Sequence, residues 1–264
     1  MKDLSNENII HIKKDGIEYL QFRKLLEYQD ILKHAYCIGL DKNFRTTDTN
    51  NISSPSYEKL GKTLNIKVEN IVKPEQAHTD QVRKIDKIED IKQYGKIDGL
   101  ITDKKNIAIS TTNADCILLL FFDPVKKVIA NTHSGWRGTV QRISVETVRK
   151  MKEIYNSRPE DIICCMCPSI RKCHFDVRED VEEIFEEEFR DLQNMNLIIE
   201  KQINTDKWKI DTIEINKNIL EAEGLKKENI IDSKICSVCN SDLIHSFRAE
   251  KLGYGLNTAI IELI

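Results

Sequence analysis

The sequence has no excess of basic residues. Its 264 residues include 40 Lys and Arg against 43 Asp and Glu, which gives a formal net charge of −3. Domains that bind nucleic acids usually carry a basic patch and a strong positive charge. We therefore expect this protein to have no nucleic-acid partner.

Long apolar runs are also absent. A helix that crosses a bilayer needs about 20 consecutive apolar residues, and no stretch of this sequence approaches that length. The opening residues, MKDLSNENIIHIKK, lack the apolar segment of a signal peptide. We expect a cytoplasmic protein without a membrane partner, in which the eight cysteines are reduced thiols or metal ligands rather than a disulfide framework.

Histidine is scarce. The six histidines include no H-x-H pair, and they are too few for a blue copper site together with a trinuclear copper cluster. The sequence therefore argues against multicopper oxidation.

Internal repeats, low-complexity segments and linkers are missing, so we expect one domain with a sizeable core. Apolar runs of strand-like composition occur at residues 68–72, 99–102, 106–112, 116–122, 127–133, 161–167 and 229–235. Helical periodicity occurs near 139–154, 179–195 and 211–223, the last with Asp211 as N-cap and Gly224 just beyond its end. The pattern predicts an α/β (α+β) fold, a single domain with mixed β-sheets flanked by helices.

A hairpin is predicted at residues 116–133. DPVK at 123–126 is a turn signal, and a loop of these four residues would place Cys116 directly opposite His133. Two side chains at that distance could bind one metal ion. They could equally be a buried strand cysteine and a hydrogen-bonded histidine at a strand end.

Six motifs together resemble the YfiH family, which is variously described as polyphenol oxidase (laccase domain), purine nucleoside phosphorylase and peptidoglycan editing factor. They are QAH at 76–78, IDGLIT at 97–102, NADC at 113–116, HSGWRGT at 133–139, CPSIRKCHFDV at 167–177 and SFRAE at 246–250. The resemblance implies a YfiH/CNF-like layered sandwich. It covers residues 34–264, and we expect residues 1–33 to form an N-terminal segment of the same domain.

The resemblance implies a metal site made by His78, Cys116 and His133, normally occupied by zinc, with copper as the alternative. Two imidazoles and a thiolate suit zinc, and three protein ligands leave a fourth position open for catalysis. We assign catalytic roles to Cys116, His133 and Asp115.

Substrate binding is assigned to Arg137, Trp136, Arg248, Gln76 and Asp98. The SGWRGT segment leads from a strand into a helix, where free N–H groups favour an anion. Arg137 could add a bidentate phosphate contact and Trp136 a flat surface for a base. Alternatively, Trp136 belongs to the core and Arg137 pairs with an acidic neighbour. Gln76 and Asp98 could hold ligand histidines in one tautomer, or serve as turn or cap residues.

The function implied is a zinc-dependent purine nucleoside phosphorylase acting on adenosine, inosine, guanosine and methylthioadenosine, with adenosine deaminase activity. Its partners would be a nucleoside and phosphate, and the protein would be a monomer or homodimer. The alternative is a cysteine- or metal-dependent hydrolase that edits peptidoglycan precursors. A copper polyphenol oxidase and a non-enzymatic metal-binding module rank below both.

Some segments depart from the family pattern. A glycine-rich stretch expected near 38–50 reads IGLDKNFRTTDTN, in which Arg45 could keep a substrate role, and Leu256 stands where an arginine is expected. Cys236 and Cys239 form a C-x-x-C pair without a second pair at zinc-ribbon spacing. They would form a second metal site only if the fold brought Cys173 and His174 beside them, so we interpret these residues as ordinary reduced cysteines.

Overall fold

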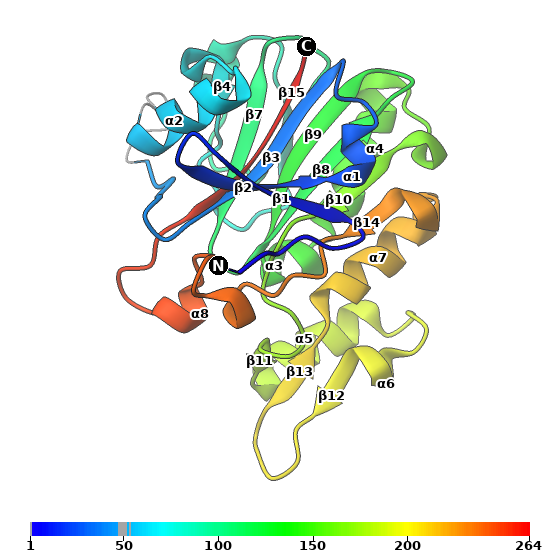
Figure 1. The fold of residues 1–264 in the computed structure, drawn as a ribbon. Helices are drawn as coiled ribbons and strands as arrows, with labels where there is room; N and C mark the ends of the chain where they lie inside the picture. The colour runs from blue at the N-terminus through cyan, green and yellow to red at the C-terminus, as the bar shows by residue number, and fades with distance from the viewer. Residues whose placement is uncertain (1, 47–51, 53) are drawn as a thin grey trace.

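Two six-stranded sheets form the centre of the molecule (Figure 1), and the computed structural model describes residues 2–46, 52 and 54–264. Sheet A has the order β1 (Ile9–Lys14), β2 (Ile17–Phe22), β3 (Leu32–Ile38), β15 (Asn257–Leu263), β7 (Ala108–Asn113) and β4 (Ile71–Val72). Sheet B has the order β14 (Ile230–Asp232), β10 (Ile163–Met166), β8 (Ile117–Asp123), β9 (Val128–Ser134), β6 (Gly99–Thr102) and β5 (Val82–Lys84). Both sheets contain parallel and antiparallel pairs, so the prediction of mixed sheets is confirmed.

The two sheets pack face to face. Asn131 of β9 crosses the interface and donates hydrogen bonds to the carbonyls of Ile109 in β7 and Ala259 in β15. Because β8 is covered on both faces, all of its residues are buried, and residues 117–122 form an unbroken apolar run rather than an alternating pattern.

Helices cover the outer faces of the sheets. Buried residues of α2 (Pro55–Leu64) pack on sheet A, and those of α4 (Ile143–Tyr155) and α7 (Thr212–Ala222) pack on sheet B. The molecule is therefore a layered α+β sandwich, as predicted. Short helices α1 (Arg23–Leu26), α3 (Trp136–Val140) and α8 (Phe247–Glu250) lie between strands.

A smaller unit projects from one end of the sandwich (Figure 1). It contains a three-stranded sheet in the order β11 (Asp176–Val177), β13 (Trp208–Ile210) and β12 (Ile199–Lys201), with α5 (Glu179–Phe189) and α6 (Met195–Ile198) beside it. Its apolar core also contains Ile215 and Ile219 of α7, so this unit is packed against the main sandwich.

The hairpin register differs from the one predicted. Leu118, not Cys116, lies opposite His133, and Asp123 lies opposite Val128. The turn starts one residue later than expected because Asp123 remains in the strand and accepts hydrogen bonds from the backbone N–H groups of Val125 and Lys126. The shift preserves the face, so Cys116 and His133 become diagonal neighbours on one side of the hairpin.

The helix predictions have mixed outcomes. The helix near 211–223 is confirmed, with the Asp211 side chain accepting from the N–H of Glu214 and Gly224 at φ +105° just after the end. The helix expected near 139–154 is divided into α3 and α4 by Arg142, which has a left-handed conformation. The helix near 179–195 ends at Phe189.

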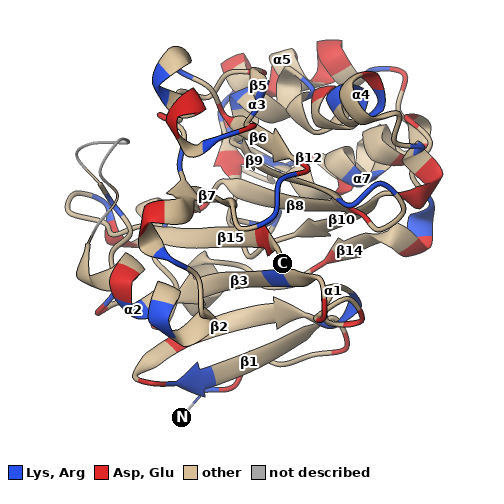
Figure 2. Ribbon diagram, turned by 90° about the horizontal axis from the view of Figure 1, so that it is seen from above, with Lys and Arg blue, Asp and Glu red and all other residues tan. Residues whose placement is uncertain are grey.

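Residues 1–33 contribute β1, β2 and α1, and β2 pairs directly with β3 in sheet A. The division at residue 34 remains a prediction. Figure 2 shows the positions of Lys and Arg scattered along the ribbon among those of Asp and Glu. Among the described residues, none of the helices has the length and apolar character that membrane crossing requires.

Candidate metal centre

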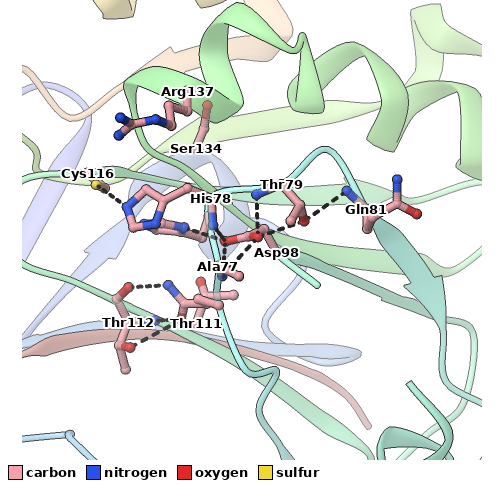
Figure 3. A network of polar contacts seen from close by, with 12 residues as sticks. Ala77, His78, Thr79, Gln81, Asp98, Thr111, Thr112, Cys116, Ser134 and Arg137 are labelled. Atoms are coloured by element: carbon pink, nitrogen blue, oxygen red, sulfur yellow. Dashed lines mark hydrogen bonds and ion pairs between the residues drawn. The ribbon is translucent and has the colours of Figure 1, made fainter. Parts of the chain in front are cut away.

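The three predicted metal ligands lie together at one end of the β8–β9 hairpin. His78 comes from the loop between β4 and β5, Cys116 immediately precedes β8, and His133 belongs to β9. Figure 3 shows His78 and Cys116 beside each other. The ligand atoms of the three side chains all lie within 4.8 Å of one another. The Sγ atom of Cys116 is 3.9 Å from Nε2 of His78, close to the separation of about 3.6 Å expected for sulfur and nitrogen on one tetrahedral zinc ion.

Asp98 holds two of the three ligands in place through hydrogen bonds. Its carboxylate is fully buried and accepts a hydrogen bond of 2.8 Å from Nδ1 of His133, which leaves Nε2 of that ring free. It also accepts the backbone N–H groups of Ala77, His78 and Thr79. One carboxylate thus sets the orientation of His133 and holds His78 at a φ of +61°.

Charges in the cluster reinforce one another. Burial would raise the pKa of the Asp98 carboxyl, but hydrogen bonds from His133 and Thr79 lower it to about 2. Burial likewise opposes ionisation of Cys116 and His133, yet their mutual attraction lowers the pKa of the thiol and raises that of the imidazole. The cluster therefore favours a thiolate, which is the form that binds metals.

Gly135 provides the space in which the cluster fits. A Cβ atom at this position would lie 2.6 Å from Cδ2 of His78 and 3.0 Å from Sγ of Cys116. In the pairing of the hairpin, Gly135 is the residue that would lie opposite Cys116. A side chain here is excluded by the two ligands.

Gly135→Ala is expected to weaken metal binding by about tenfold or more, because relieving such overpacking costs about 1–3 kcal/mol and His78 must move. Zinc affinity measured by competition with a chromophoric chelator would check this. Gly95→Ala is the matched control, since nothing lies within 4 Å of a Cβ atom at Gly95. Equal affinities for the two variants would contradict the arrangement described.

A cavity of about 710 Å³ opens beside the cluster. His78, Cys116 and His133 line it together with the predicted residues Gln76, Asp115, Trp136 and Arg248. Arg45 also lines the cavity, although part of the segment 38–50 (residues 47–50) lies outside the described residues. Leu256, which stands at an expected arginine position, is part of the wall.

Two predicted substrate-binding residues are not among the residues that line the cavity. Asp98 lies behind His133, and Arg137 is exposed with its guanidinium carbon 4.2 Å from the centre of the Trp136 ring. In Figure 3, Arg137 lies on the helix side of the cluster, away from Asp98. The assignments of Arg137 and Asp98 to substrate binding therefore remain predictions that the cavity lining does not support.

Three other predicted residues, Gln76, Asp115 and Arg248, are fixed by hydrogen bonds. The amide of Gln76 pairs with the backbone of Thr112, donating to its carbonyl and accepting from its N–H. The carboxylate of Asp115 accepts from the Ser237 hydroxyl at 2.6 Å and from the N–H of Arg248 at 2.7 Å. Arg248 in turn donates to the carbonyls of His174 and Asp176.

Sequence reasoning missed Lys73, a buried lysine in the cavity wall. Burial lowers the pKa of its ammonium group to about 8, and the neighbouring charge of Arg45 contributes. Its hydrogen bonds go to the Phe44 carbonyl and the Thr46 hydroxyl. Nothing in the sequence distinguishes Lys73 from the other lysines, because its burial depends on tertiary packing.

The fold and the centre define a layered α+β protein with a His–Cys–His cluster at the edge of a cavity. The chain belongs to the family described as multi-copper polyphenol oxidoreductase laccase, which matches residues 33–264. A solved structure described as hypothetical protein YfiH from Bacillus licheniformis has a TM-score of 0.79 at 21% identity and covers 93% of this chain and 96% of that one. The family recognised from the motifs is therefore confirmed.

Relatives of the chain carry the names of nucleoside enzymes. Purine nucleoside phosphorylase YlmD of Bacillus subtilis is 29% identical over 201 residues, which cover 74% of this chain and 71% of that protein. Adenosine deaminase RL5, from an unknown prokaryotic organism, is 31% identical over 201 residues and 74% of each chain. The match to mouse purine nucleoside phosphorylase LACC1, at 24% identity over 230 residues, covers 86% of this chain and spans about half of that protein (51%).

Proposed function

We propose that the protein is a zinc-dependent purine nucleoside phosphorylase that acts on adenosine, inosine, guanosine and methylthioadenosine and also deaminates adenosine. The observation that carries this proposal is the convergence of His78, Cys116 and His133 at the wall of a cavity large enough for a nucleoside. The names of the relatives support the same reaction class.

The donor set fits a zinc ion. Two imidazoles and one thiolate are its usual ligands, and a three-ligand site keeps one position for substrate or water. When bound, the ion would supply Lewis-acid chemistry to the cavity. Copper is the alternative ion, but multicopper chemistry is disfavoured because His11, His34 and His245 make their hydrogen bonds elsewhere.

The cavity offers charge for an anion. Lys73 and Arg45 both line it, and the hydrogen bonds seen among the described residues go from Lys73 to the Phe44 carbonyl and the Thr46 hydroxyl and from Arg45 to the Tyr254 carbonyl. Two cations that have no carboxylate partner within the described part of the chain favour a bound anion such as phosphate. In phosphorolysis, phosphate forms a bond to the sugar while the bond to the base breaks, giving the free base and a sugar phosphate. Lys73 and Arg45 would bind and orient that phosphate.

The cavity also offers flat surfaces for a base. Phe247 and Tyr254 pack edge to face with ring centres 5.1 Å apart, and both line the cavity with Phe175 and Trp136. Aromatic faces of this kind bind the apolar surface of a purine. Both oxygens of Asp115 already accept hydrogen bonds, so we propose that it positions Arg248 rather than moving a proton.

A panel of purine nucleosides, assayed with and without phosphate on zinc-loaded protein, tests the proposal. Phosphate-dependent release of free base would establish phosphorolysis, and conversion of adenosine to inosine without phosphate would establish deamination. Absence of turnover with every nucleoside would contradict both activities and favour a metal-binding module.

One observation favours the hydrolase alternative. Cys116, His133 and Asp98 form a Cys–His–Asp series in which Asp98 orients the imidazole and the imidazole favours the thiolate. Cleavage of a cell-wall precursor by metal-free protein would support this reading. The cytoplasmic location and the monomeric or homodimeric state remain predictions.

The affinity for phosphate is expected to fall as the pH rises above about 8, because Lys73 loses its charge through its lowered pKa. At one pH unit above the pKa only about a tenth of the lysine is charged, so the KM for phosphate should rise by up to about tenfold. Lys73→Arg, which stays charged, is expected to lose this dependence. Titration of phosphate itself affects the wild-type protein and Lys73→Arg equally. If the KM for phosphate depends on pH in the same way in both proteins, Lys73 has no role in phosphate binding.

A further inference from the structure

A second group of metal-binding side chains lies outside the cavity. Cys173 and His174 belong to the segment between β10 and β11, and Cys236 and Cys239 belong to the segment between β14 and α8. About sixty residues of sequence separate the two pairs, and the fold brings all four ligand atoms within 4.8 Å of one another. The fold therefore brings Cys173 and His174 beside the C-x-x-C pair, which is the condition for a second metal site.

The distances match a tetrahedral ion. Zinc–sulfur bonds of about 2.3 Å and zinc–nitrogen bonds of about 2.0–2.1 Å place two sulfurs about 3.8 Å apart, and sulfur and nitrogen about 3.6 Å apart. The Sγ atom of Cys173 is 3.6 Å from that of Cys236 and 3.8 Å from that of Cys239. The Nδ1 atom of His174 lies 3.2, 3.7 and 3.5 Å from the sulfurs of Cys173, Cys236 and Cys239.

Other interpretations of the cluster fit less well. A disulfide requires sulfurs about 2.05 Å apart, far less than the separations seen here. Three sulfurs and one nitrogen do not suit calcium or magnesium, which prefer oxygen ligands. Three soft ligands and an imidazole in a tetrahedron are typical of structural zinc.

We propose that Cys173, His174, Cys236 and Cys239 hold a second zinc ion with a structural role. Four protein ligands complete the coordination, so this site has no open position for substrate. Two of the cysteines are exposed, which gives an ion in solution access to the site.

The second ion would join a segment that lines the cavity to a segment that holds Asp115, another residue of the cavity wall. Next to His174, Phe175 and Asp176 line that cavity, and the carbonyl of His174 accepts a hydrogen bond of 2.7 Å from Arg248. Next to Cys236, Ser237 donates to the carboxylate of Asp115. Zinc at this position would therefore fix Arg248 and Asp115 relative to Phe175 without touching the substrate.

Metal counting tests the proposal independently of the proposed enzymatic function. Wild-type protein loaded with excess zinc and then passed through a gel-filtration column should retain two zinc ions per chain. The double variant C173S/C239S should retain one zinc ion, bound at the first centre. His78→Ala should also retain one, bound at the second site. Cys37→Ala removes a buried thiol outside both clusters and should retain two.

Spectra of the cobalt-substituted proteins distinguish the two sites. His78→Ala should keep the strong thiolate-to-cobalt charge-transfer bands of a site with three sulfurs, whereas C173S/C239S should keep only the weaker band of the single thiolate of Cys116. If the double variant does not fold, the zinc contents of the wild-type protein and of His78→Ala still give an answer. A single zinc that disappears in His78→Ala would overturn the second site, whereas a single zinc that persists in His78→Ala would support it and contradict the first.

Discussion

His78→Ala and Cys116→Ala are each expected to abolish turnover, with a loss of about 10³-fold or more, and to remove the bound ion of the first centre. The reason is that metal catalysis contributes several kcal/mol to a reaction barrier, and each substitution leaves only two of the three ligands at this centre. Nucleoside turnover and metal content, measured on the same preparations, would check the prediction.

The comparison between these two variants separates zinc chemistry from a cysteine nucleophile. A nucleophilic mechanism needs Cys116, His133 and Asp98, which are all intact in His78→Ala. It therefore predicts that Cys116→Ala is inactive while His78→Ala keeps most of its activity. His11→Ala, which removes an imidazole bonded to Glu18 in the β1–β2 hairpin, is the control and should change neither metal nor turnover.

Asp98→Ala is expected to lower the free energy of unfolding by about 3–5 kcal/mol, the range for loss of one partner of a buried charged pair. The substitution leaves Nδ1 of His133 and the backbone N–H groups of Ala77, His78 and Thr79 without an acceptor. Denaturant unfolding of the metal-free protein would measure the loss.

Asp98→Asn keeps the shape of the side chain and removes its charge, so it isolates the effect on the metal. Loss of a carboxylate that orients a ligand histidine usually weakens metal binding by about 10–100-fold. Asp90→Asn is a matched control because Asp90 likewise accepts backbone N–H groups, those of Asp86 and Lys87, within its own loop. Unchanged zinc affinity in Asp98→Asn would show that Asp98 supports the fold alone.

The sequence predicted those features that depend on local signals. The N-cap at Asp211 and the glycine after α7 were read correctly because both act within one helix end. The register of the β8–β9 hairpin was wrong because a single residue, Asp123, could either begin the loop or end the strand while capping the turn. The predicted face was still correct, because moving the turn by one residue changes the partner of His133 by two residues, from Cys116 to Leu118, and side chains two apart share a face.

The features that were missed depend on packing between distant segments. Lys73 is buried by the assembled sandwich, and its sequence neighbours give no sign of this. Cys173 and Cys236 are distant in sequence and meet through tertiary structure, in which Ser169 and Cys236 form an isolated bridge between the two segments. The exposure of Arg137, which belongs to the HSGWRGT motif and lies against the Trp136 ring, could not be read from the motif either, and its substrate role stays a prediction.

The position of the hairpin in sheet B has a consequence for how the first centre exchanges its ion. β8 and β9 are the two innermost strands of the six, whereas His78 lies on a loop. Central strands open only when the whole domain unfolds, while loops open on their own. We expect His78 to be the ligand that moves when a metal ion enters or leaves, while Cys116 and His133 keep their positions at the hairpin. We therefore expect the residence time of a bound ion to depend on the hydrogen bonds that the backbone of the His78 loop donates to Asp98.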